Sequence, residues 1–132
     1  MHHFDETSYD GKNVIYVDCS APPPDNGLKD ILDAVQNAIA SRQTDSLNAI
    51  VNFRHTYFDS KTMNHVRTFL QRAMPCLTKC VFIGVDGVKK MILESITKAN
   101  GLKAPFFAFG KKKALELILE TEQETQPSPD DV

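Results

Sequence analysis

The chain has 132 residues, of which 42% are hydrophobic and 24% are charged, as in an ordinary globular domain with its own core. A net charge of −2 argues against a dedicated nucleic-acid-binding protein. No apolar run approaches the roughly 20 residues of a membrane helix, and the first residues lack the pattern of a signal peptide. The three cysteines form no disulfide pattern, so we expect a cytoplasmic protein.

The charges are unevenly distributed along the chain. Residues 79–113 contain eight lysines against Asp86 and Glu94, whereas residues 114–132 contain six acidic residues and no basic one. The lysine-rich segment forms either one positive face or ordinary solvated helix surfaces, which are the commoner outcome. Residues 121–132 add two prolines and very little to bury. We therefore expect a single domain over residues 1–120 followed by a disordered acidic tail over 121–132.

The first third of the chain predicts two strands and a helix. Residues 1–12 are polar, contain the turn signal Asp10-Gly11, and are interpreted as an edge strand. Residues 14–17 are β-branched and apolar and form the first clear strand. After three consecutive prolines, Asp25 or Asn26 caps a helix. Its apolar face consists of Leu28, Ile31, Leu32, Val35 and Ile39.

The middle of the chain predicts a second strand and a second helix. The strand covers residues 47–53, and the helix opens at Asp59, a good N-cap with Phe58 and Met63 placed around it as a hydrophobic staple. Pro75 ends this helix. Its expected buried face consists of Met63, Val66, Phe69, Leu70 and Ala73.

The last part predicts two more strand–helix units. Residues 81–83 form a buried strand that reaches a helix through the Gly84–Gly87 turn, and Asn100-Gly101 ends this helix. Its helically spaced apolar residues are Val88, Ile92, Ile96 and Ala99. Pro105 favours a short edge strand over residues 106–109. A final helix follows Gly110, with Ala114, Leu115, Ile118 and Leu119 expected to point inward.

Strands that alternate with helices indicate an α/β fold. We predict a single domain with a four- or five-stranded, mainly parallel sheet and helices on its faces. The expected core comprises Ile15, Val17, Leu32, Val35, Ile50, Val51, Phe69, Val81, Ile83, Ile92 and Ile96.

Three segments carry a family resemblance. They are the strand with its terminal aspartate at residues 14–18, the strand and glycine turn at 81–90, and the closing strand and helix start at 107–109 and 113–116. In this order and spacing they resemble the sulfate transporter and anti-sigma-factor antagonist (STAS) domains. The closer match is a divergent branch of small bacterial proteins related to the sporulation anti-sigma-factor antagonist.

The resemblance implies a STAS architecture and a non-enzymatic regulatory module that binds a partner protein, with partner switching in some members. In such regulators a kinase phosphorylates a serine at a helix start, and Ser60 occupies this place. The implied interaction surface is Phe58, Asp59, Ser60 and Lys61. The chain departs from the pattern where Asn52 replaces an aspartate and Lys61-Thr62 replace a glycine. Asp59 and Ser60 also have a purely structural explanation as a helix cap and first helical residue.

An alternative function is the binding of a small molecule, a lipid or an anion. The loop after the second strand lies where ligands of open α/β sheets bind, and the glycine turn could direct N–H groups at an anion without being a P-loop. The candidate ligand-binding residues are Arg54, His55, Tyr57, Gly84, Gly87 and Lys89. A plain surface loop and a tight packing turn remain the structural alternatives.

A third reading is an enzyme of unknown reaction, but no motif places a nucleophile beside a base, so no catalytic residue is assigned. A metal site built from His55, His65, Cys76 and Cys80 does not match the spacing of structural zinc sites, and Cys80 is expected in the core. We therefore expect no metal and no cofactor. A protein partner is expected, and both a small-molecule ligand and a homodimer are compatible with the sequence.

Overall fold

A computed structural model describes residues 3–21, 27–41 and 47–120. Its centre is a five-stranded sheet with the strand order β1-β2-β3-β4-β5. The strands are β1 (Phe4–Tyr9), β2 (Lys12–Asp18), β3 (Leu47–Asn52), β4 (Cys80–Ile83) and β5 (Phe106–Ala108). The hairpin strand β1 is antiparallel to β2, and all other neighbours are parallel. The predicted α/β class and mainly parallel sheet are confirmed, with five strands.

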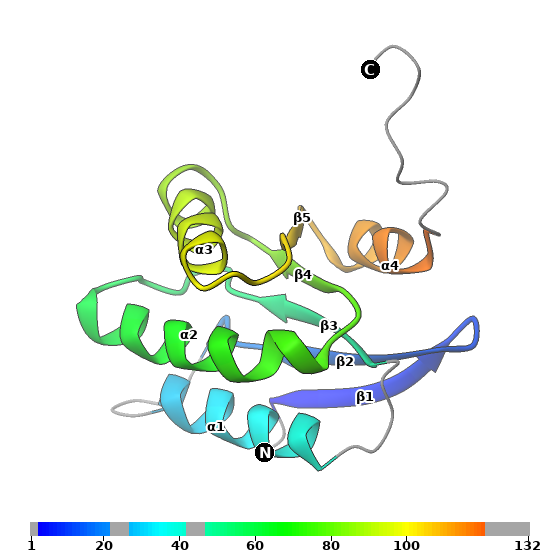
Figure 1. Ribbon diagram of the computed structural model, residues 1–132. Helices are drawn as coiled ribbons and strands as arrows, with labels where there is room; N and C mark the ends of the chain where they lie inside the picture. Colours follow the sequence, from blue (N-terminus) through cyan, green and yellow to red (C-terminus); the bar gives the residue numbers. More distant parts are fainter. Residues whose placement is uncertain (1–2, 22–26, 42–46, 121–132) are drawn as a thin grey trace.

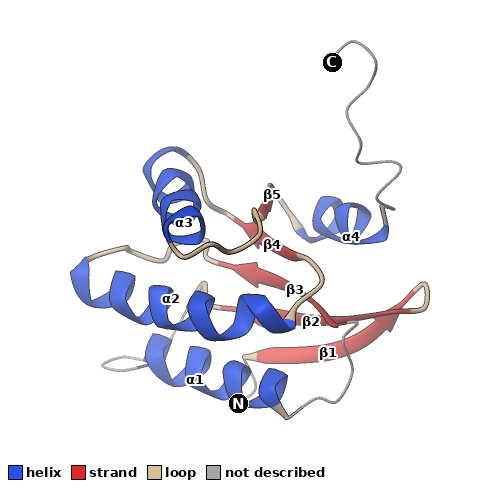
Figure 2. Ribbon diagram, in the orientation of Figure 1, coloured by secondary structure: helices blue, strands red, loops and turns tan. Residues whose placement is uncertain are grey.

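Helices cover the two faces of the sheet unequally (Figures 1 and 2). The helices are α1 (Gly27–Ala40), α2 (Ser60–Ala73), α3 (Gly87–Ala99) and α4 (Lys111–Leu119), with a short 3-10 turn η1 (Met74–Cys76) after α2. Helices α1, α2 and α3 share the larger apolar cluster with one face, whereas α4 packs on the other. Because β2 to β5 are parallel, their carboxyl ends lie at the same edge of the sheet, between the two helix layers.

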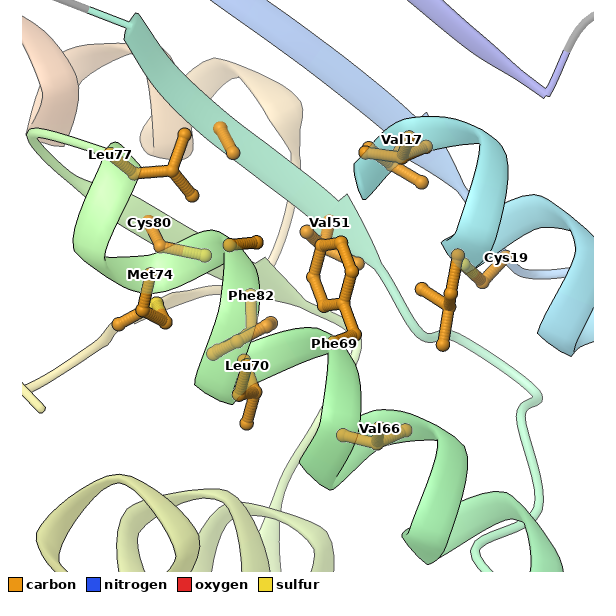
Figure 3. Packing of buried hydrophobic residues seen from close by; sticks show 14 of the residues in the cluster. Val17, Cys19, Val51, Val66, Phe69, Leu70, Met74, Leu77, Cys80 and Phe82 are labelled. Atoms are coloured by element: carbon orange, nitrogen blue, oxygen red, sulfur yellow. The ribbon is translucent and has the colours of Figure 1, made fainter. Parts of the chain in front are cut away.

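The central strands are apolar on both sides because both faces are covered. Side chains alternate along a strand, so Phe82 of β4 enters the larger cluster while Val81 and Ile83 pack toward α4. Figure 3 shows Phe82 among residues of α2, including Phe69 and Leu70. Full burial of one such side chain contributes about 1.5–3 kcal/mol. The unbroken apolar run of β4 is thus explained by its position in the sheet.

The expected core is confirmed, Ile96 of α3 included, except for Ile92, because α3 is rotated relative to the sequence-based interpretation. Val88 is 71% exposed, Ala99 is exposed and Ile92 is only partly buried, whereas Leu93 and Thr97 face the core. The helix carries two overlapping apolar stripes, and helical spacing alone does not decide which one packs inward. The polar Thr97 is tolerated because its hydroxyl donates to Leu93 O at 3.1 Å and Glu94 O at 3.0 Å.

Smaller corrections concern helix faces and caps. Met63 and Leu119, predicted to point inward, are only partly buried, and Leu115 is partly buried but packs against the smaller apolar cluster beside α4. Asn100 ends α3 and Gly101 follows with a φ of +66°, as the sequence predicted. The predicted caps Asp25 and Asn26 and the predicted tail over 121–132 lie outside the described residues. Within the described part of the chain, no helix is long and apolar enough to cross a membrane.

The rotation of α3 gives a stability prediction. Leu93→Ala should lower the free energy of unfolding by about 2–5 kcal/mol, because it leaves a cavity under a fully buried side chain. Val88 belongs to the apolar stripe predicted from the sequence but is exposed. Val88→Ala should therefore change the free energy of unfolding by less than about 0.5 kcal/mol. Urea denaturation of the two variants measures both values. A greater loss for Val88→Ala than for Leu93→Ala would contradict the observed rotation.

Candidate functional site

The segments singled out from the sequence meet at the carboxyl edge of the sheet. The β3–α2 loop (residues 53–59), the β4–α3 turn (84–86) and the β5–α4 connection (109–110) all leave the sheet at this edge. In open α/β sheets this is the edge at which ligands bind. The candidate interaction residues and the candidate ligand-binding residues are therefore neighbours in one region.

Hydrogen bonds hold the β3–α2 loop in a defined path. The Arg54 N–H donates to Asn52 Oδ1 at 2.9 Å, and the buried Thr56 hydroxyl donates to Cys19 O at 2.9 Å. His55 adopts a φ of +66°, which a non-glycine residue tolerates only where its surroundings impose it. The loop backbone is thus fixed, while the Arg54, His55 and Tyr57 side chains are exposed, Tyr57 by 78%.

Arg54 lies directly against the glycine turn. Gly84 has a φ of +77°, and a Cβ built on it would lie 2.7 Å from Arg54 Cβ and 2.8 Å from Arg54 Cα. These distances are too short for any larger residue at position 84. At Gly84 the β3–α2 loop and the β4–α3 turn are therefore in contact, and no ligand fits between them at this point.

The Arg54 side chain ties a third segment to this contact. Its guanidinium Nη2 donates to Phe109 O at 2.6 Å, which fixes the β5–α4 connection to the β3–α2 loop. A hydrogen bond from a charged donor is among the stronger ones in proteins. Arg54, one of the candidate ligand-binding residues, thus has a structural role as well.

The start of α2 has the predicted cap. Asp59 precedes the helix in extended conformation, and its Oδ1 accepts the Thr62 N–H at 2.8 Å. This backbone hydrogen bond, helped by the Thr62 side chain, lowers the pKa of Asp59 below its ordinary value. Ser60 and Lys61 follow the cap and are exposed.

Phe58 connects the start of α2 to the core and to α3. Its ring packs edge-on against Phe53, with centroids 5.4 Å apart. Lys89 Nζ lies 5.7 Å from the centroid of the Phe58 ring, within the range of a cation–π contact. The candidate residue Lys89 is therefore brought to the candidate interaction surface Phe58–Lys61.

The start of α3 lacks the side-chain cap that an aspartate before a helix often provides. Asp86 occupies the N-cap position of α3, but its side chain makes no capping hydrogen bond. Gly87 follows with a φ of +48°, and a Cβ there would meet no atom within 4 Å. Gly87 thus serves the turn conformation and leaves open space beside it, in contrast to Gly84.

Asn52, which departs from the family pattern, has a structural explanation. Besides accepting from the Arg54 N–H, its Nδ2 donates to the Tyr16 hydroxyl at 3.2 Å. The Tyr16 ring in turn lies 4.5 Å from Lys111 Nζ. At the end of β2, the hydroxyl of Ser20 donates to the Asp18 carboxylate and holds the pKa of Asp18 below its ordinary value. The contacts among Asn52, Tyr16 and Lys111 join three separate segments, so sequence analysis missed them.

The cysteines and histidines that the structure describes were considered as metal ligands from the sequence. Cys19 and Cys80 are buried, and burial raises the pKa of each thiol to about 12, so both stay protonated at neutral pH. The expectation that Cys80 is a core residue is confirmed. Among the described residues, no group of three or more His, Cys, Asp or Glu side chains could hold a metal ion. The candidate Cys76 is exposed.

The contact between Gly84 and Arg54 predicts a large substitution effect. Gly84→Ala should lower the free energy of unfolding by more than about 2 kcal/mol, because it adds a backbone clash to the strain of a left-handed residue. The matched control is Gly11→Ala, where φ is +80° but the space is open, and where the strain alone costs about 1–2 kcal/mol. Thermal or urea denaturation measures both. Equal losses would show that the close approach of Arg54 is unimportant.

The Asp59 cap predicts a pH-dependent effect. Because the folded-state pKa of Asp59 is lowered, its carboxylate stabilises the fold above its ordinary pKa, and this contribution is lost as the pH falls through the folded-state value. Asp59→Asn keeps a capping oxygen that does not titrate. The stability difference between the natural protein and Asp59→Asn should therefore shrink from neutral to acidic pH, as measured by urea denaturation. A difference independent of pH would contradict the role of the charged cap.

Comparison with solved structures identifies the architecture. The structure of an anti-sigma-factor antagonist (STAS) domain protein from Planctomyces limnophilus matches with a TM-score of 0.53, over 89% of this chain and 98% of that chain, at 12% sequence identity. No family model matches the sequence, and no curated protein is similar to it. At this identity the likeness concerns the fold, and it agrees with the resemblance seen in the sequence. The chain therefore has the fold of a STAS domain.

Proposed function

We propose that this chain is a non-enzymatic, cytoplasmic regulatory module that binds a partner protein through the start of α2. The binding surface consists of Phe58, Asp59, Ser60 and Lys61. The proposal rests chiefly on one observation: Ser60 is an exposed first helical residue directly after an N-cap, in a chain with the fold of a STAS domain. The three free cysteines are consistent with the cytoplasm.

Ser60 is suited to act as a phosphoacceptor whose modification changes which partner protein binds. A phosphate adds a charge of about −1.5 to −2. At Ser60 this charge would lie at the positive end of the α2 dipole, so the helix would tolerate it. The neighbouring Lys61 is exposed, and Lys89 lies over Phe58. Phosphorylation would therefore leave the fold intact and reverse the local charge that a partner meets, which is the requirement for partner switching.

Several chemically reactive groups are engaged or buried in the structure, which favours a binding role over catalysis. Asp18 is engaged by the Ser20 hydroxyl, and the thiols of Cys19 and Cys80 are buried with a raised pKa. Arg54 is hydrogen-bonded to a backbone carbonyl. Each of these groups is buried or hydrogen-bonded within the domain. The start of α2, in contrast, has exposed side chains that a partner can contact.

The proposal predicts opposite effects of two Ser60 variants on the binding of one partner. Tagged natural protein and Ser60→Ala should capture the same protein from cells of the source organism. Ser60→Asp should lose it, with a weakening of about tenfold or more once the partner is purified and titrated, because a negative charge replaces a neutral hydroxyl at the interface. Mass spectrometry of the natural protein should find phosphate on Ser60.

The matched control is Ser8→Asp, which places the same charge on an exposed residue of β1 near the opposite edge of the sheet. It should bind the partner as the natural protein does, and all variants should have similar melting temperatures. If Ser60→Asp binds the partner as tightly as Ser8→Asp does, and Ser60 carries no phosphate, the switch is refuted.

A further inference from the structure

A groove of about 430 Å³ lies between the start of α3 and the β5–α4 connection. Two segments far apart in the sequence line it, namely residues 85–87 with Lys90 and residues 107–109 with Lys113. It lies beyond the carboxyl ends of β4 and β5, and Arg54 is hydrogen-bonded to Phe109, one of its lining residues. Its volume is in the range of small-molecule sites in proteins.

One side of the groove is apolar and is held in place. Phe107 and Ala108 are half-buried members of β5, and Phe107 packs on Phe82 with ring centroids 5.9 Å apart. Phe109 follows with 93% of its surface exposed. The backbone that carries this ring is fixed, because Phe109 O accepts the hydrogen bond from Arg54 at 2.6 Å. An exposed aromatic ring on a fixed backbone is suited to cover the apolar part of a ligand.

The other feature of the groove is its positive charge. Lys90 and Lys113 line it from the two helices, and Lys90 Nζ lies 5.2 Å from the centroid of the Phe107 ring. Asp86 is the carboxylate among the lining residues. Glu116 lies 3.9 Å from Lys113 Nζ, but both side chains of this pair are more than half exposed, so it neutralises the lysine only weakly.

The helix starts add to this charge. Neither α3 nor α4 has an acidic residue in its first turn, and the side chain of Asp86, the N-cap residue of α3, makes no capping hydrogen bond. Instead lysines occupy both first turns, where the helix dipole disfavours cations. An anion in the groove would offset this repulsion at both helices.

From this combination we propose that the groove binds a small organic anion with an apolar body, such as a carboxylate or a phosphate ester. The anionic head lies between Lys90 and Lys113, and the apolar body covers Phe107 and Phe109. This site shares only Gly87 with the ligand-binding residues suggested by the sequence, and none of its lining residues belongs to the partner surface Phe58–Lys61.

The test uses decyl phosphate, below its micelle concentration, as a probe of this chemistry. Titration followed by backbone amide NMR should shift the signals of Gly87, Lys90 and residues 107–113. The double variant Lys90→Gln with Lys113→Gln should bind about tenfold or more weakly, because charge-assisted contacts to the head are lost. Phe109→Ala should also weaken binding, by about threefold or more, because it removes apolar contact area.

The matched control is Lys98→Gln, which removes one positive charge from the exposed last turn of α3. It should bind decyl phosphate as the natural protein does. Decyltrimethylammonium, of the same chain length and opposite charge, should not bind. Inorganic phosphate should bind at least about tenfold more weakly than decyl phosphate, because it lacks the apolar body.

Several results would overturn the proposal. These are equal binding of decyltrimethylammonium, equal binding of inorganic phosphate, or signal shifts confined to the second groove, which lies between α2 and α3 and is lined by Met63, Met91 and Ile96. Vesicles of phosphatidylglycerol distinguish a free ligand from a bilayer surface. Binding to these vesicles without binding of free decyl phosphate would overturn the assignment to a small molecule.

Discussion

The arrangement of the carboxyl edge depends on the contact between Arg54 and Gly84. The Arg54 backbone approaches Gly84 so closely that no Cβ fits there, and the Arg54 guanidinium holds Phe109 O. One residue thus fixes the β3–α2 loop, the β4–α3 turn and the β5–α4 connection relative to one another. Both candidate surfaces lie at this edge: the start of α2 follows the β3–α2 loop, and the groove is lined by the β4–α3 turn and the β5–α4 connection.

A row of aromatic rings supports this edge from inside the domain. Phe53 stacks on Phe82 at 5.7 Å, Phe82 contacts Phe107, and Phe58 packs edge-on against Phe53. The row runs from the start of α2, across β4, to β5. Rigid packing of this kind resists small displacements. Ser60 follows Phe58 at one end of the row and Phe109 follows Phe107 at the other, so the row supports the backbone next to both exposed residues.

The parts of the structure that depend on local sequence were predictable, and those that depend on packing were not. The Asp59 cap and the Asn100-Gly101 helix end follow from short-range backbone hydrogen bonds, which a few neighbouring residues determine. The β4 strand was recognisable from its continuous apolar run. The rotation of α3 was missed because the helix has two apolar stripes, and packing against the rest of the domain selects Leu93 over Val88.

The candidate sites show the same division. Sequence pattern placed Ser60 at a helix start, but it could not show that Lys89 reaches Phe58 while the next residue, Lys90, reaches Phe107. One turn of α3 therefore borders both proposed sites. A phosphate at Ser60 and an anion in the groove would both interact with this turn, and two like charges repel. The two proposed sites would then oppose each other electrostatically, with a strength that falls as salt rises, because screening acts on exposed charges.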